Sequence, residues 1–181
     1  MDCEGGCGTV YSISTSGVET VLYEFKGGSE GAYPRAPLID VNGILYGTTG
    51  GGGNSGCAFG CGVIYSVTTD GKYTVLYRFT GNSDGGQPDA GLIYVNGTLY
   101  GTTYEGGGSS ACSGGCGTVY SVSTTGTESV LHSFAGGSDG MNPTAPLLDV
   151  NGTLYGTTVN GGGLGCNEKT DGCGTVFALT P

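Results

Sequence analysis

Eight cysteines are the residues whose spacing most directly implies chemistry. They form four local pairs in glycine-rich stretches: Cys3 with Cys7, Cys57 with Cys61, Cys112 with Cys116, and Cys166 with Cys173. A disulfide requires two Cα atoms within about 7 Å, which a short flexible loop permits. A Cys₄ zinc site would need two pairs to converge, although successive pairs are a whole repeat apart. The spacing therefore predicts four disulfides, with zinc as the alternative.

Disulfides in turn predict an oxidising compartment, because they persist in exported proteins and are reduced in the cytosol. The sequence opens Met1, Asp2, Cys3, Glu4, without the basic and apolar regions of a signal peptide. We therefore expect these residues to be a segment of an exported precursor, located outside the cell or on its surface. No apolar run approaches the ~18 residues needed to cross a membrane.

A recurring acidic position is the next candidate for chemistry. Glu30, Asp84 and Asp139 each follow a serine in a glycine-bounded loop that ends at a proline. Such loops can hold Ca²⁺, but the ion takes roughly six to eight oxygen ligands and each loop offers one carboxylate. An Asx-type turn explains the same pattern. We expect no cofactor, with Ca²⁺ as the alternative if neighbouring loops or chains add ligands.

Groups suited to catalysis are scarce. The only histidine, His132, stands where the other copies have Tyr23 and Tyr77, and no adjacent serine or cysteine motif supplies a nucleophile. Paired carboxylates can hydrolyse glycosides, but the acids of this chain fall in turns and on polar strand faces. We expect no enzyme. An extracellular hydrolase, the alternative, would need a carboxylate pair that differs between copies.

Two positions match the N-glycosylation pattern, Asn96-Gly97-Thr98 and Asn151-Gly152-Thr153. Asn-Gly also forms tight turns, so turn chemistry alone explains them. Tyrosines that precede a glycine in every copy offer a surface for stacking a sugar ring, although packing between sheets is the simpler interpretation. These tyrosines are Tyr46, Tyr100 and Tyr155.

The composition limits the possible partners and folds. The chain has 41 glycines and 6 prolines in 181 residues, too many for long helices. Five Lys and Arg against fifteen Asp and Glu give a formal charge of -10. Because there is no basic surface to neutralise phosphates, nucleic acid is not an expected partner.

An internal repeat accounts for the glycines. Leu-Tyr-Gly-Thr-Thr begins at Leu45, Leu99 and Leu154, so the steps are 54 and 55 residues. The chain is a single repeat domain, 1–181, built of three copies and the first strand of a fourth. The predicted boundaries are about 3–56, 57–111, 112–165 and, for the partial copy, 166–181.

The sequence of each copy predicts two hairpins of short antiparallel strands. We call the four strands A to D. Alternating apolar residues mark A and B, and Asn-Gly joins C to D at Asn42, Asn96 and Asn151. An all-β chain of four-stranded units of about 54–57 residues is typical of β-propeller blades. An antiparallel β-solenoid is the alternative architecture.

The motifs Leu-Tyr-Gly-Thr-Thr, Gly-Thr-Val-[Tyr/Phe] and Val-Leu-x-x-Phe, spaced as in this chain, resemble the GloVer tandem repeat of bacterial surface proteins. The resemblance covers essentially the whole chain. It implies an exported, propeller-like β-repeat protein and carries no catalytic motif.

The copies also suggest a function. Three copies are fewer than the roughly four to eight blades of a propeller, and the last strand A has no partner strand B. We therefore predict a structural scaffold that self-associates head to tail through this terminal strand, forming a ring or fibre. The alternative is a segment of a larger surface propeller that binds a glycan or a protein.

Overall fold

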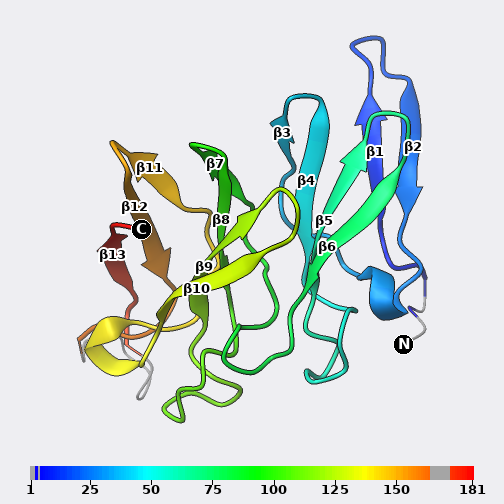
Figure 1. The fold of residues 1–181 in the computed structure, drawn as a ribbon. Helices are drawn as coiled ribbons and strands as arrows, with labels where there is room; N and C mark the ends of the chain where they lie inside the picture. Colours follow the sequence, from blue (N-terminus) through cyan, green and yellow to red (C-terminus); the bar gives the residue numbers. More distant parts are fainter. Residues whose placement is uncertain (1–2, 4, 164–171) are drawn as a thin grey trace.

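The computed structural model describes residues 3, 5–163 and 172–181, and these form short antiparallel strands (Figure 1). The strands within these ranges are β1 (Thr9–Ile13), β2 (Glu19–Glu24), β3 (Ile39–Val41), β4 (Ile44–Thr49), β5 (Val63–Thr68), β6 (Tyr73–Arg78), β7 (Ile93–Val95), β8 (Thr98–Thr103), β9 (Thr118–Ser123), β10 (Glu128–Ser133), β11 (Leu148–Val150), β12 (Thr153–Thr158) and β13 (Thr175–Leu179). Two 3₁₀ turns, Gly28–Glu30 and Gly137–Asp139, lie in acidic loops.

Both predicted hairpins form in the copies that the structure describes. The C–D hairpins turn at Asn42, Asn96 and Asn151, whose φ angles are 54°, 49° and 54°. Asparagine tolerates this left-handed conformation, and the glycine that follows has it too. Each complete A–B hairpin contains one irregularity in its register, as between Ile64 and Tyr65, which the alternating pattern does not predict.

Complete sheets combine two successive copies. One sheet has the order β3-β4-β5-β6, and the next has the order β7-β8-β9-β10. Strands C and D therefore come from one copy, and strands A and B come from the following copy. A two-stranded sheet, β1-β2, precedes them, and a three-stranded sheet, β11-β12-β13, follows. The sheet is thus out of phase with the sequence repeat by half a unit.

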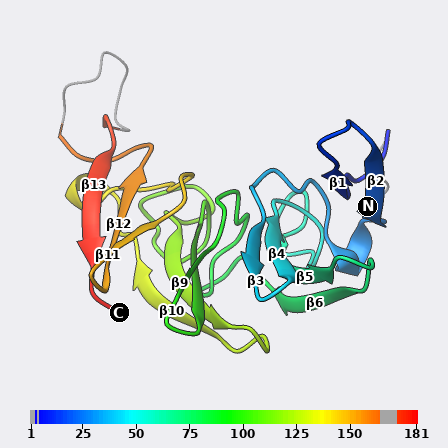
Figure 2. The ribbon, with the colours of Figure 1, turned by 90° about the horizontal axis from the view of Figure 1, so that it is seen from above.

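Viewed from above, the four sheets follow one another along an arc (Figure 2). The short C strands hold the sheets together on one side, since β7 contacts both β3 and β11. This arrangement confirms the predicted all-β repeat with blade-like sheets, and none of the sheets closes into a barrel.

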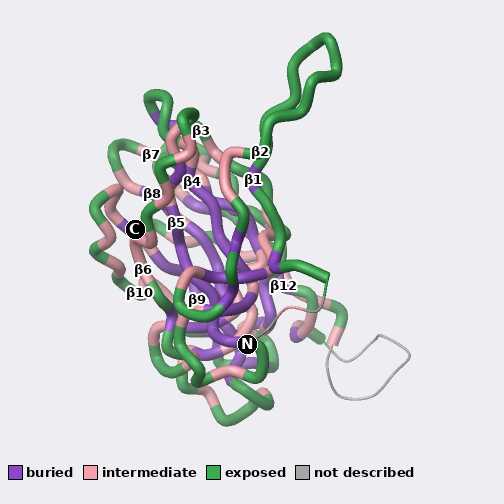
Figure 3. The backbone as a smooth tube through the Cα atoms, turned by 90° about the vertical axis from the view of Figure 1, so that its right-hand side faces the viewer, coloured by how far each residue is buried: buried purple, intermediate pink, exposed green. Residues whose placement is uncertain are grey.

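The apolar core lies between neighbouring sheets (Figure 3). A phenylalanine that follows strand B packs edge-on against an aromatic ring of the next strand A, with ring centres 5.1–5.2 Å apart. The three pairs are Phe25 with Tyr65, Phe79 with Tyr120, and Phe134 with Phe177. Every copy therefore depends on its neighbour to bury its rings. In the described ranges, no helix has the length and apolar character needed to cross a membrane.

Candidate functional site

The cysteine loops contain disulfides. Three of the four predicted pairs are bonded, Cys3–Cys7, Cys57–Cys61 and Cys112–Cys116, with Cα atoms 5.0–5.2 Å apart. The fourth predicted pair includes Cys166, which lies outside the described residues. Cys61 and Cys116 are fully buried, so these loops pack into the protein as fixed elements.

Each disulfide loop is tied to the loop that follows strand B. The second cysteine's carbonyl accepts a hydrogen bond from the backbone N–H of a residue with positive φ. The three bonds are Tyr33 to Cys7 at 2.9 Å, Gln87 to Cys61 at 2.8 Å, and Asn142 to Cys116 at 2.8 Å. The disulfide loops thus hold the loops that follow strand B in place at this end of the molecule.

The acidic loop residues are used within the protein. The Tyr23 hydroxyl donates to Glu30 Oε2 at 2.7 Å, and the Tyr77 hydroxyl donates to Asp84 Oδ2 at 3.0 Å. Asp84 also accepts the Thr80 backbone N–H at 2.9 Å. Burial, and then these hydrogen bonds to carboxylates, raise the pKa of both tyrosines. These carboxylates therefore hold each acidic loop against strand B of the same copy.

His132 takes the place of these tyrosines in the third copy. Its Nε2 lies 3.1 Å from Asp139 Oδ2, and its ring packs edge-on against Phe134. The half-buried aromatic position that the sequence predicts is therefore confirmed. Across the described part of the chain, no group of three or more His, Cys, Asp or Glu side chains gathers to hold a metal ion. Calcium at Glu30, Asp84 or Asp139 stays a prediction.

The other predicted site residues lie in different surroundings. Asn96 and Asn151 are exposed in their hairpin turns, and their glycosylation stays a prediction. Tyr46 is buried, Tyr100 is half-buried and Tyr155 is exposed, so these tyrosines do not form one continuous stacking surface.

The sequence does not single out Glu128, a partly buried acid on β10. It occupies the position that Tyr73 has in the previous copy, and its Oε1 is buried without a hydrogen-bond partner in the described structure. Burial, followed by repulsion from Asp84, raises its pKa to about 7. The sequence offers one sign of this residue, which is an acid at a repeat position that is aromatic in the preceding copy.

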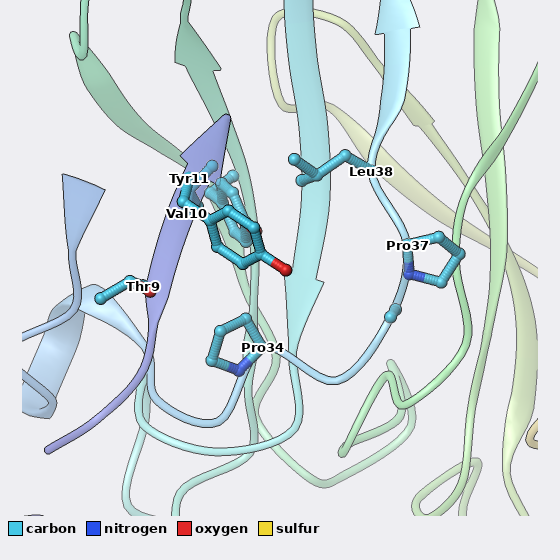
Figure 4. A pocket seen from close by; sticks show the side chains of 8 residues that line it. Thr9, Val10, Tyr11, Pro34, Pro37 and Leu38 are labelled. Atoms are coloured by element: carbon cyan, nitrogen blue, oxygen red, sulfur yellow. The ribbon is translucent and has the colours of Figure 1, made fainter. Parts of the chain in front are cut away.

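A cavity of about 340 Å³ lies beside β1 (Figure 4). We call it the β1 groove. Residues of β1 line one side and the segment that leads to β3 lines the other. Its principal lining residues are Thr9, Val10, Tyr11, Pro34, Pro37 and Leu38.

Complete sheets fill the equivalent position with a D strand. There β4 pairs with β5, and the Thr48 hydroxyl donates to the Ala90 carbonyl at 3.1 Å. Tyr11 is 56% exposed, whereas its equivalents Tyr65 and Tyr120 are 1% and 0% exposed. Leu38 is 37% exposed and the equivalent Leu92 is 6% exposed. The β1 groove is therefore a position shaped for a strand.

Repeated antiparallel sheets that share their cores with their neighbours define an all-β tandem-repeat protein. The family model described as the Gloeobacter/Verrucomicrobia repeat matches residues 2–113 and 55–181, which together cover nearly the whole chain. The chain belongs to this repeat family, as its motifs predict. No curated protein shows a significant match to it.

Proposed function

We propose that the protein is an extracellular structural repeat protein. Separate chains of it associate head to tail through their incomplete sheets. One observation carries the proposal: the tyrosine that complete sheets bury is more than half exposed on β1. An open strand edge beside exposed apolar residues favours pairing with another strand. Three disulfides support the extracellular setting. The proposal includes no catalytic activity.

The β1 groove fits a strand that carries glycine followed by threonine. In the complete sheet, Gly101 leaves room for the Tyr120 ring, since an added Cβ would lie 2.5 Å from the hydroxyl oxygen. Gly47 faces Tyr65 in the same way. A strand with a larger residue at this position would collide with Tyr11.

A second chain offers such a strand in its β12, which has the same Leu-Tyr-Gly-Thr-Thr motif. The sequence predicts that the terminal strand, β13, joins the next chain, and this stays a prediction. Strand β13 pairs with β12 within its own chain and lacks the glycine that the β1 groove requires. Strand β12 lies between β11 and β13, so this pairing requires β13 to leave its position. Strand β1 of one chain then lies beside β12 of another chain, where β13 lies within its own chain. Repetition of this contact produces a ring or a fibre.

A charge placed in the groove tests the proposal. Tyr11→Glu introduces a carboxylate that the docked strand would bury, so we expect association to weaken by at least about tenfold. Val18→Glu adds the same charge at an exposed residue between β1 and β2 and serves as the matched control. Sedimentation velocity over a range of concentrations measures both variants and the wild type. A wild-type chain that remains monomeric contradicts the proposal, as does equal weakening by the two variants.

A further inference from the structure

A second cavity, of about 280 Å³, opens at the loop end of the molecule between the first and second copies. We call it the Tyr33 cavity. It is lined by Tyr33, Arg35, Gly50, Phe59 and Gln87. None of these residues lines the β1 groove, so the two cavities are separate.

Tyr33 occupies its position against the preference of the backbone. Its φ is 60°, a left-handed conformation that asparagine adopts more readily than an aromatic residue. The third copy has Asn142 at this position, with φ 57° and the same backbone hydrogen bond to a cysteine carbonyl. The turn therefore does not require a tyrosine, and the ring that it adds lines a cavity.

Phe59 is also unnecessary for the fold. It is 63% exposed, in the disulfide loop between Cys57 and Cys61. The corresponding residues of the neighbouring loops are Gly5 and Gly114. The fold therefore tolerates the absence of this ring, while its presence beside a cavity provides an aromatic face for a ligand.

Polar groups complete the lining. The side chain of Arg35 is 64% exposed and lies 3.4 Å from Asp89 Oδ1, a long contact that leaves other guanidinium N–H groups available. Gln87 Nε2 donates to Glu105 Oε2 at 3.0 Å. The carboxylates of Asp89 and Glu105 therefore contact two of the lining residues, and the chain has a formal charge of -10. This balance opposes an anionic ligand.

We propose that the Tyr33 cavity binds one ring of a neutral glycan. The rings of Tyr33 and Phe59 pack against the C–H face of the sugar, and Arg35 and Gln87 hydrogen-bond to its hydroxyl groups. The binding is non-covalent. The cavity between the second and third copies is lined by Asn142 and by a single aromatic side chain, Tyr104, so it lacks the aromatic pair of the Tyr33 cavity.

The test uses the full chain and soluble oligosaccharides of dextran, xylan and β-glucan, with oligogalacturonate as the acidic comparison. Saturation-transfer NMR detects binding, and titration gives its strength. We expect the wild type to bind at least one neutral oligosaccharide, and Tyr33→Asn and Phe59→Ala to weaken that binding about tenfold or more. Tyr94→Ala removes a ring exposed outside the cavity and should leave binding unchanged.

Thermal unfolding separates lost binding from lost structure. Tyr33→Asn supplies the residue that the third copy uses, so its unfolding midpoint should stay within a few degrees of the wild type or rise. The proposal is overturned if no neutral oligosaccharide binds, if oligogalacturonate binds more tightly, or if the two variants bind like the wild type. Because Tyr11→Glu leaves this cavity intact, the outcome is independent of the proposed association.

Discussion

The β1–β2 and β9–β10 hairpins have similar sequences and different surroundings. Strand β1 has Thr-Val-Tyr-Ser-Ile, and β9 begins Thr-Val-Tyr-Ser-Val. Tyr120 of β9 is completely buried beside β8, whereas Tyr11 of β1 is 56% exposed. Pairing within a hairpin is therefore local, while burial depends on a D strand from a different copy. The core of this protein is a property of junctions between copies.

Replacing each tyrosine with alanine should give the largest difference in stability between the two hairpins. Tyr120→Ala empties a packed junction and should lower the free energy of unfolding by about 3–5 kcal/mol. Tyr11→Ala removes an exposed ring and should cost less than about 1 kcal/mol in the monomer. Urea unfolding at low protein concentration measures both. Equal losses would mean that Tyr11 is already buried in solution.

The disulfides should stabilise both regions alike. Cys3–Cys7 and Cys112–Cys116 close rings of equal length, and the second cysteine of each is buried. Loop closure predicts a loss of about 2 kcal/mol when either pair is replaced by alanine. Urea unfolding of the two double variants provides the comparison. A loss confined to Cys112–Cys116 would show that only a complete sheet benefits from its disulfide.

Glu128 should give the smallest effect, and it distinguishes the junction that contains β10 from the preceding junction, which contains β2 and β6. In the folded protein its pKa is raised to about 7, so the folded state holds this proton more tightly than the unfolded state. The contribution to stability is therefore present below the usual pKa and lost as the pH rises towards 7. From about pH 5 to about pH 8 we expect a loss of about 1 kcal/mol, reduced by solvent screening, that Glu128→Gln abolishes.

Urea unfolding at the two pH values measures this difference. Tyr73 occupies the same position in the preceding junction, where it stacks on Tyr23 with ring centres 3.9 Å apart. Tyr73→Phe is the control, because it keeps the ring and adds no group that titrates in this range. An unchanged pH dependence in Glu128→Gln would place the responsible proton elsewhere.

Local chemistry explains why the sequence predicts the hairpins. Asn42 and Gly43 specify a turn, and alternating residues such as Val63 and Tyr65 specify a strand. The disulfides follow from spacing within single loops. Each of these features requires contacts only a few residues apart.

Contacts between copies were not predictable in the same way. The pairing of β4 with β5 crosses a glycine-rich loop with no turn signal, so the sheet composition was missed. The positive φ of Tyr33 was also missed, because tyrosine rarely adopts it. Both cavities arise from such non-local features, and the candidate sites therefore needed the structure.

An engineered disulfide between two chains detects the contact of β1 with β12 directly. In complete sheets the tyrosine of strand D pairs with a serine of strand A, as Tyr100 does with Ser121. If β1 docks beside β12 of another copy, Tyr155 pairs with Ser12. A mixture of Ser12→Cys chains and Tyr155→Cys chains, mapped by peptide mass spectrometry after mild oxidation, detects this contact.

Docking of β1 beside β12 predicts covalent dimers that join position 12 of one chain to position 155 of another. The double variant Tyr155→Cys, Ala178→Cys, oxidised at low protein concentration, is the control, because these two residues pair in the separate chain, where β13 lies beside β12. If this control forms its bond while the mixture yields no link between positions 12 and 155, β1 does not dock beside β12. That result would contradict the proposed association.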